Sequence, residues 1–359
     1  MKLATGVASA GEAVLGVKIS TMNSAADNAA REVRKGSLYG LSAALLFGAA
    51  TPLSKLLLPH VSPLMLAALL YLGAAGLVTS IRGLAVVTGK QSTEARIARS
   101  DAATLLAMVA FGGVLGPVLM LFGLARISAL AGSLLLNLEA FFTIAIAVVI
   151  FREHLERSSA LAAAFIVLGA LLLSYQPGEV KGSFFGVAAI IAACLCWAID
   201  NNLSQRLSLR DPFTIVQVKS AGAGLTSLAL ALAMGHGFPA PAFLVAALGL
   251  GCVSYGASLI CVMLALRYLG AAREAAWFST APFIGAALSI PIFGYLPTAS
   301  ELAGMVFMMA GIFLLVRERH THLHTHEPTE HDHLHVHDEH HRHLHEGPVM
   351  EPHSHMHRH

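Results

Sequence analysis

Two halves of this chain share one layout. One run of five hydrophobic segments begins at Gly36-Ser37-Leu38-Tyr39-Gly40, and a second begins at Gly182-Ser183-Phe184-Phe185-Gly186, with an offset of 146 from Gly36 to Gly182. Further along, Pro63 of the first run corresponds to Pro212 of the second. Since five is an odd number, segments that each cross a membrane would place the second unit upside down relative to the first. The sequence therefore predicts two inverted repeats, an arrangement typical of membrane transporters.

The composition places these segments in a membrane. Hydrophobic residues make up 56% of the chain, mean hydropathy is +0.68, and only 12% of the residues are charged, whereas roughly a quarter are charged in soluble domains. The segments are mostly about 17 to 25 residues long, which suits a helix crossing a hydrocarbon core ~30 Å thick. We predict an all-α integral membrane protein with ten transmembrane helices at residues 38–58, 63–81, 102–124, 129–150, 158–175, 184–204, 213–234, 240–264, 274–293 and 300–316.

Lys and Arg residues set the predicted orientation, because positive residues are retained on the cytoplasmic side. With the N-terminus inside, fifteen of them flank the inner span ends, while the outer turns hold only Arg126 and Lys181. Both termini should therefore be cytoplasmic, with the spans in a bacterial-type inner membrane. The predicted organisation is a cytoplasmic N-terminal segment without fixed structure (1–35), a first repeat (36–176), a second repeat (182–316) and a cytoplasmic tail (317–359).

Three stretches carry a resemblance to a known family. They are the small-residue-rich first helix at residues 40–55, the end of the fourth helix at Phe151-Arg152-Glu153-His154-Leu155, and Ala281-Pro282-Phe283-Ile284-Gly285-Ala286 in the ninth. Over residues 36–316 the chain resembles the EamA-type transporters of the drug/metabolite transporter superfamily, which have two five-helix repeats. The resemblance implies a central cavity lined by the first four helices of each repeat, peripheral fifth and tenth helices, and alternating access for small metabolites.

Charged residues within the predicted spans include Lys55, Glu139, Asp200 and Lys219. A charge at mid-membrane costs roughly 2.5–3.5 kcal/mol on insertion scales, so these side chains should face the bundle interior. Glu139 is the most informative, because it lies about mid-helix and stands where the ninth helix has Pro282. Such a carboxylate could bind a proton in one facing state and release it in the other, which would couple export to protons. The alternative is one fixed contact, with Lys219 or Asn137, that locks two helices.

Hydrogen-bonding residues at the end of the sixth span and in the seventh predict a polar wall at the inner end of a substrate path, or else a helix end that emerges into headgroups. The aromatic residues Trp277, Tyr255 and Tyr71 could stack on a substrate or serve as packing. The candidates for substrate binding or coupling are Glu139, Lys219, Asp200, Lys55, Asn137, Asn201, Asn202, Gln217 and Trp277.

Small residues and prolines predict how the helices pack. Gly112 and Gly116 form a G-x-x-x-G, and Gly249 recurs with Gly251 at a corresponding stage of the second repeat. We expect all four to let helix backbones approach closely. Pro117 can kink its helix and free a carbonyl toward a cavity.

Histidines crowd the end of the chain, where they make up 16 of the 40 residues from His320 to His359. Neutral imidazole suits Zn, Ni, Cu or Co. We predict that this tail lacks fixed structure without metal and binds a divalent transition metal, with pH sensing as the alternative. The predicted ligands are His320, His322, His324, His326, His331, His333, His335, His337, His340, His341, His343, His345, His353, His355, His357 and His359.

Three functions fit these features to different degrees. An exporter of a small metabolite or amino-acid-like solute explains the duplication and the charges within the spans, and it requires no cofactor. A divalent-metal (Ni, Co or Zn) exporter or a metal-gated transporter would also explain the histidine-rich tail. An intramembrane enzyme is the remote alternative, because the sequence contains no H-E-x-x-H or G-x-S-x-G. The expected partners are a small-molecule solute and membrane lipid, without nucleic acid, and a homodimer is left open.

Overall fold

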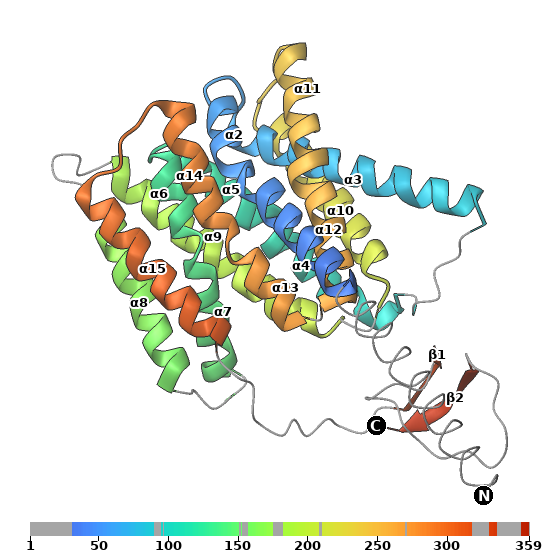
Figure 1. Ribbon diagram of the computed structural model, residues 1–359. Coiled ribbons are helices and arrows are strands. Elements are labelled where there is room, and N and C mark those ends of the chain that lie inside the picture. Colours follow the sequence, from blue (N-terminus) through green and yellow to red (C-terminus); the bar gives the residue numbers. More distant parts are fainter. Residues whose placement is uncertain are drawn as a thin grey trace, which may run out of the picture.

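The computed structural model describes residues 31–89, 95, 97–150, 152, 157–174, 182–207, 210–269, 271–317, 330–335 and 353–358. Within these ranges ten helices are long and apolar enough to cross a membrane. Figure 1 shows them as one bundle of helices. This confirms the predicted all-α membrane fold with ten spans.

The ten spans follow one another along the chain, and several consist of more than one helical element. Their bounds are Arg31–Leu57 (with α2, Ala50–Leu57, at its end), α3 (Pro63–Val87), Arg99–Leu124 (η1, Arg99–Asp101; α4, Ala102–Met108; η2, Val109–Leu115; α5, Gly116–Leu124), Ala129–Ile150 (α6, Ala129–Leu135; α7, Leu138–Ile150), α8 (Arg157–Ser174), α9 (Gly182–Gln205), α10 (Pro212–Ala233), Pro241–Leu269 (α11, Pro241–Leu250; η3, Gly251–Ala257; α12, Ser258–Leu269), Arg273–Phe293 (α13, Ala271–Phe278; α14, Ala281–Phe293) and α15 (Ala299–Arg317).

Several helix ends lie beyond their predicted bounds, those of the first two spans by the most residues. The first span begins at Arg31 and the second continues to Val87, so the last residues of the segment predicted to be unstructured, 31–35, are helical. Polar and basic residues lower the hydropathy at these ends, so a hydropathy reading stops the helices too early. The helices can continue there because long basic side chains lie along a helix and reach the interface. Phe151 and residues 153–156, part of the predicted family motif, lie outside the described residues.

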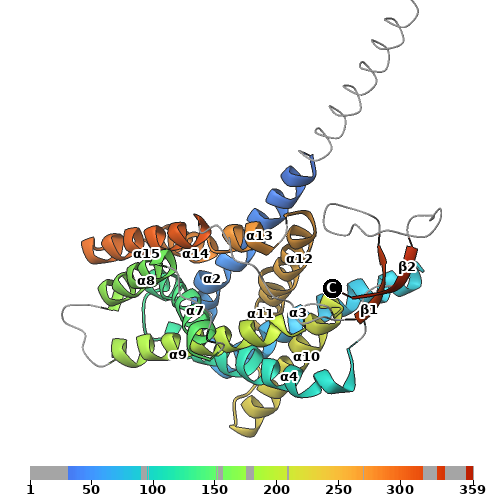
Figure 2. The same ribbon diagram turned by 90° about the horizontal axis from the view of Figure 1, so that it is seen from below.

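The repeats pack against each other through equivalent helices. Span two contacts span seven (α3 with α10), span four contacts span nine (α6 with α14), and span five contacts span ten (α8 with α15). Figures 1 and 2 show α8 and α15 side by side at one flank of the bundle. In addition, the third helix of each repeat contacts the second helix of the other, η2 with α10 and η3 with α3. These reciprocal contacts fit two repeats that are related by a pseudo-two-fold axis.

Both repeats depart from regular α-helix at matching places. Spans three and eight each contain a seven-residue π-helical segment, η2 and η3. Spans four and nine are each interrupted, between α6 and α7 and between α13 and α14. π segments concentrate at functional sites, and discontinuous membrane helices form the binding sites of many transporters. The irregular turns therefore direct attention to the middle of the bundle.

The tail contains two short strands, where the sequence predicts no fixed structure without metal. β1 (Glu330–His335) pairs with β2 (His353–Arg358) in antiparallel register. His331, His333 and His335 are the backbone partners of His357, His355 and His353. The sequence reading failed here because an alternating H-x-H pattern also has the period of two that a strand requires.

Candidate functional site

An ion pair inside the bundle forms the centre of the candidate site. Lys219 of α10 donates from its Nζ to Oδ2 of Asp200 on α9. The Asp200 side chain is 6% exposed and the Lys219 side chain 22%. Oδ1 of Asp200 has no hydrogen-bond partner among the described residues. A buried carboxylate with one charged partner and one free oxygen is a polar site that a membrane protein rarely keeps without use.

The carbonyl of Gly112 lies beside this ion pair and is freed by the π segment. In the π register the amide of Gly116 donates to Phe111 O, and the residue five beyond Gly112 is Pro117, which has no N–H. Tyr71 Oη and Trp197 Nε1 donate to Gly112 O instead, both at 3.0 Å. The freed carbonyl that Pro117 predicts is therefore present, and two side chains from spans two and six satisfy it.

Glycine at position 112 also makes room for Asp200. The space that a Cβ would fill at Gly112 is occupied by the Asp200 carboxyl group, and at Gly116 it is occupied by the Trp197 indole. Span three therefore approaches span six closely through the predicted G-x-x-x-G. Gly251 packs in the same way against the backbone of Leu70, whereas nothing lies within 4 Å of a Cβ at Gly249. The packing prediction is wrong for Gly249, because this residue faces a cavity.

Glu139 joins the cluster through Asn201. The Asn201 Nδ2 donates to Glu139 Oε1 at 2.6 Å, which links α7 with α9. Glu139 lies in the first turn of α7, just after the interruption of span four, and the charges of Asp200 and Lys219 act on it electrostatically. The sequence suggested a contact of Glu139 with Lys219 or Asn137, whereas in the structure its side chain accepts from Asn201. Two carboxylates and one ammonium group thus share the centre of the bundle.

Other predicted candidates lie apart from this cluster. Asn137 donates to Leu134 O at 2.9 Å and faces Met308 of span ten. Asn202 donates to Ala198 O of its own helix at 2.8 Å, and Gln217 donates to Thr79 Oγ1 at 2.9 Å. The Cβ of Trp277 packs against Gly40 of span one. These contacts are local or join neighbouring helices, so the structure brings together only part of the predicted set.

Lys55 holds the end of another span. Its Nζ donates to Leu124 O at 2.6 Å and to Ile127 O at 2.9 Å. Leu124 is the last residue of span three, where helix carbonyls lack intrahelical donors and a cation is favourable, and Ile127 lies in the turn that follows. Lys55 therefore lies near the end of its own span because it caps the end of a neighbouring helix.

Replacing this lysine tests the capping role. We expect Lys55→Met to lower the free energy of unfolding by about 1.5 kcal/mol, because two hydrogen bonds from a charged donor are lost at a half-buried position. Lys55→Arg should keep most of the stability. Thermal unfolding of the two variants in detergent measures the difference, and equal midpoints would contradict the role.

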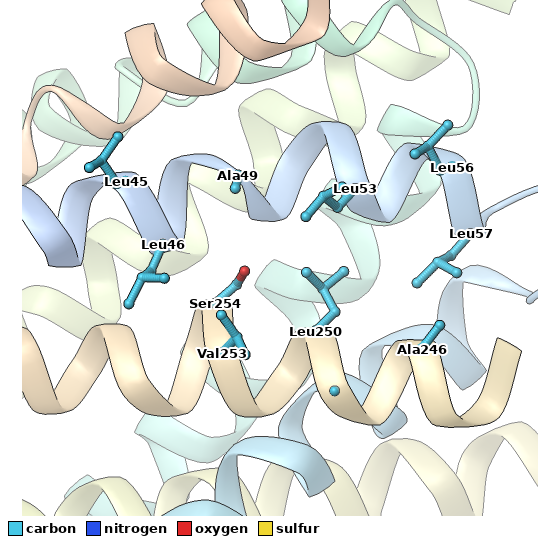
Figure 3. A pocket seen from close by; sticks show the side chains of 11 residues that line it. Leu45, Leu46, Ala49, Leu53, Leu56, Leu57, Ala246, Leu250, Val253 and Ser254 are labelled. Carbon is cyan, nitrogen blue, oxygen red and sulfur yellow. The ribbon is translucent and has the colours of Figure 1, made fainter. Parts of the chain in front are cut away.

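An apolar cavity of about 460 Å³ lies between spans one and eight. Its volume falls within the range of small-molecule sites. Figure 3 shows Leu46, Leu250 and Ser254 between the two helices. Among the described residues that line it, none is charged and Ser254 is the only hydroxyl. The lining residues are Leu45, Leu46, Ala49, Leu53, Leu56, Leu57, Ala246, Gly249, Leu250, Val253 and Ser254.

Two tyrosines stand between the cavity and the charged cluster. Tyr255 follows the lining residue Ser254, and its ring packs on Tyr71 with 5.5 Å between centroids. Tyr71 in turn reaches Gly112 O, against which Asp200 packs. The sequence reading named both tyrosines and expected a central cavity, but it did not assign the leucine and alanine residues of spans one and eight to a cavity wall, since they have the same pattern as lipid-facing residues.

Comparisons with known proteins agree with this architecture. The sequence profile of the EamA-like transporter family matches residues 34–175 and 184–317. A protein of Methanothermobacter thermautotrophicus, named an uncharacterized transporter, is 31% identical over 294 residues, which cover 78% of this chain and 85% of that protein. A crystal structure of a protein superposes with a TM-score of 0.55 at 16% identity, over 78% of this chain and 95% of the other; at that identity the likeness shows the fold alone. The match over both repeats confirms the resemblance: this chain belongs to the EamA-like transporter family of the drug/metabolite transporter superfamily.

Proposed function

We propose that this membrane transporter exports a small metabolite or amino-acid-like solute by alternating access, and that Glu139 couples export to protons. The observation that carries the proposal is the contact of Glu139 with Asn201, beside the Asp200–Lys219 ion pair, at the interruption of a membrane span. A carboxyl group that is only half-buried and has an uncharged partner can exchange a proton without breaking an ion pair. Discontinuous helices supply substrate and ion sites in many transporters.

The distribution of basic residues supports the proposed orientation in the membrane. Arg82, Arg99, Arg206 and Arg210 lie at one end of spans two, three, six and seven. By the positive-inside rule we propose that this end, and with it both termini, faces the cytoplasm. The cavity between the outer halves of spans one and eight then lies toward the exterior.

The cavity limits the chemistry of the solute. A lining of aliphatic side chains with one hydroxyl favours an uncharged, apolar part of a molecule. The charges of Asp200, Lys219 and Glu139 lie beyond Tyr255 and Tyr71. A solute with an apolar body and a charged or polar head would use both regions.

Filling the cavity should block transport without loss of stability. At Gly249 a Cβ meets nothing within 4 Å, so Gly249→Leu can place its side chain in the cavity and gains up to about 1 kcal/mol of helix propensity. We expect solute flux to fall by at least roughly tenfold. The matched control is Gly76→Leu, because Gly76 has equally open surroundings and does not line the cavity. Equal flux in both variants would contradict a solute site here.

Reconstitution tests the proposed activity. Purified protein is first screened by thermal shift against amino acids, nucleosides, sugars and divalent metals, because a ligand that binds the folded state raises apparent stability. The stabilising solute is then loaded into proteoliposomes with a pH-sensitive dye. Solute efflux accompanied by proton movement in the opposite direction supports the proposal. Efflux without any proton movement would leave a transporter but reject proton coupling.

The histidine tail supports a second role, in metal binding. Three cross-strand pairs of histidines follow from the register of β1 and β2, and imidazole is a common ligand of Zn, Ni, Cu and Co. The remaining predicted ligands, His320, His322, His324, His326, His337, His340, His341, His343, His345 and His359, lie outside the described residues. Within the described part of the chain, no three His, Cys, Asp or Glu side chains come together as a metal site. The metal proposal therefore rests on the tail.

Truncation separates a metal-binding tail from a metal-transporting pore. We expect calorimetric titration with Zn²⁺ or Ni²⁺ to show binding to the full chain, and at least roughly tenfold weaker binding after removal of residues 320–359. Solute flux at saturating metal shows whether the tail regulates transport. Metal flux that persists in the truncated protein would favour the metal exporter instead. Undiminished binding without the tail would contradict the proposed ligands.

A further inference from the structure

Spans one and eight carry exposed faces that consist only of apolar residues. Between residues 38 and 57 of span one, every exposed residue is a leucine. The exposed positions recur at helical spacings, with the half-buried Ala49 between them on span one, so each set lies on one face of its helix. They are Leu38, Leu41, Leu45, Leu53 and Leu56 on span one, and Ala242, Val245, Ala246, Gly249 and Val253 on span eight. Within a membrane span, a face without polar groups borders the lipid rather than a water-filled path.

The apolar cavity is a groove between these two faces. Its rims belong to them, because the exposed residues among those that line it are Leu45, Leu53, Leu56, Ala246, Gly249 and Val253. Its floor is buried and consists of Leu57, Leu250 and Ser254. Figure 3 shows the rim residues along two antiparallel helices, with the side chains of Leu250 and Ser254 between them. A groove with a buried floor and exposed rims is open along its side, where the bilayer lies.

The length of the groove matches one leaflet of a bilayer. From Leu45 to Leu57, the first and last lining residues of span one, the helix rises about 18 Å. Half of a hydrocarbon core ~30 Å thick is about 15 Å. An acyl chain of a phospholipid crosses one leaflet, so its length suits the groove. A partner helix is about 10–12 Å wide with its side chains, which is too wide for a groove of this length with a volume of about 460 Å³.

Aromatic rings mark both ends of the groove. Beyond Leu57, the exposed ring of His60 stacks on Phe243 with 4.0 Å between centroids. A ring with a polar edge suits the boundary between acyl chains and headgroups. At the other end, the rings of Phe47 and Tyr255 lie 5.7 Å apart and join spans one and eight next to the lining residues. The groove is thus bounded by rings at both ends and open along its side.

The geometry points to a lipid site: the groove between spans one and eight holds one acyl chain of a membrane phospholipid, which enters sideways from the bilayer. The occupant follows from the continuity of the rims with the lipid-facing surface of both spans, and from the aliphatic lining. This inference deepens the proposed function and rests on it for the use of the site, because an apolar solute that occupies the cavity would have to displace the chain.

Photochemical crosslinking from lipid to protein tests the site. The full chain is reconstituted in vesicles of phosphatidylethanolamine and phosphatidylglycerol that contain a small fraction of phosphatidylcholine with a diazirine on one acyl chain. After irradiation, mass spectrometry maps the labelled residues. We expect labelling of residues 45–57 and 246–254 to exceed that of the exposed face of α8 and α15 (Leu168, Leu171 and Val306) by at least roughly threefold, because a bound chain dwells longer than annular lipid.

A matched pair of variants assigns the labelling to the groove. Gly249→Leu places a side chain in the groove, since a Cβ there meets nothing within 4 Å, and labelling should fall to the level of the α8 and α15 face. Ala246→Leu fills the groove from the neighbouring turn and should have the same effect. Gly76→Leu, at an equally open glycine outside the groove, should leave labelling unchanged. Thermal unfolding establishes that each variant is folded.

Two results would overturn the lipid site. One is equal labelling of the groove and of the α8 and α15 face, which would mean annular lipid only. The other is unchanged labelling in both Gly249→Leu and Ala246→Leu. Loss of the label on addition of the stabilising solute supports a shared site. Labelling that persists while solute is transported supports the lipid site and moves the solute elsewhere, so failure of the inference and failure of the proposed solute site are distinguishable.

Discussion

Glu139→Gln should remove proton-driven export and leave solute exchange intact. The glutamine oxygen can still accept the hydrogen bond that Asn201 now gives to Glu139 at 2.6 Å, so the contact between α7 and α9 is kept while the proton site is lost. We expect flux driven by a pH gradient to fall by at least roughly tenfold, to the background of empty vesicles. Counterflow of labelled against unlabelled solute, which needs no net proton movement, should stay within about twofold.

The matched control for this variant is Glu274→Gln. Glu274 is another carboxylate within a span, and no described contact joins it to the cluster of Glu139, Asp200 and Lys219. Its replacement should leave pH-driven flux unchanged. If Glu139→Gln retained full pH-driven flux, or if both variants lost it equally, Glu139 would not be the coupling group.

Removal of Lys219 should be the most destabilising single change in the cluster. Lys219→Met leaves the Asp200 carboxylate buried without its cation, a situation that costs about 3–5 kcal/mol and lowers the unfolding midpoint by roughly 5–15 °C. Asp200→Asn should cost less, because the Lys219 side chain is 22% exposed and can extend toward water. Thermal unfolding in one detergent compares the variants.

A double variant identifies the cause of that loss. Lys219→Met combined with Asp200→Asn removes both charges and should recover most of the midpoint, since a pair replaced by neutral groups is often near neutral in stability. Gln217→Met, two residues away on α10, controls for the added apolar side chain. No recovery in the double variant would mean that lost packing, rather than an unpaired charge, destabilises the protein.

The spans and the duplication were readable from sequence because they depend on local patterns. Hydrophobic length sets a membrane helix, and the offset from Gly36 to Gly182 sets the repeat. The Asp200–Lys219 pair was missed, although a signal existed. The two residues stand at similar distances from the turn before Pro212, so an antiparallel hairpin places them at one depth in the membrane.

The rest of the site depends on packing that no local pattern encodes. Gly249 and Gly251 are the same residue type in the same stretch of sequence, yet Gly249 faces a cavity and Gly251 packs against the backbone of Leu70. Lys55 and Glu139 are both charges within a span, but the carbonyls of Leu124 and Ile127 engage the first. The difference is decided by where distant helices end, which only the tertiary arrangement determines.

Each repeat contains one π segment, which holds one residue more than an α-helix of the same length. If η2 or η3 returned to α geometry, the released residue would lengthen its helix by about 1.5 Å and turn the part beyond it by about 100°. Tightening in one repeat and loosening in the other would turn spans three and eight about their axes in opposite senses. The Gly112 carbonyl accepts hydrogen bonds from Tyr71 and Trp197, and both bonds would have to break before span three could turn.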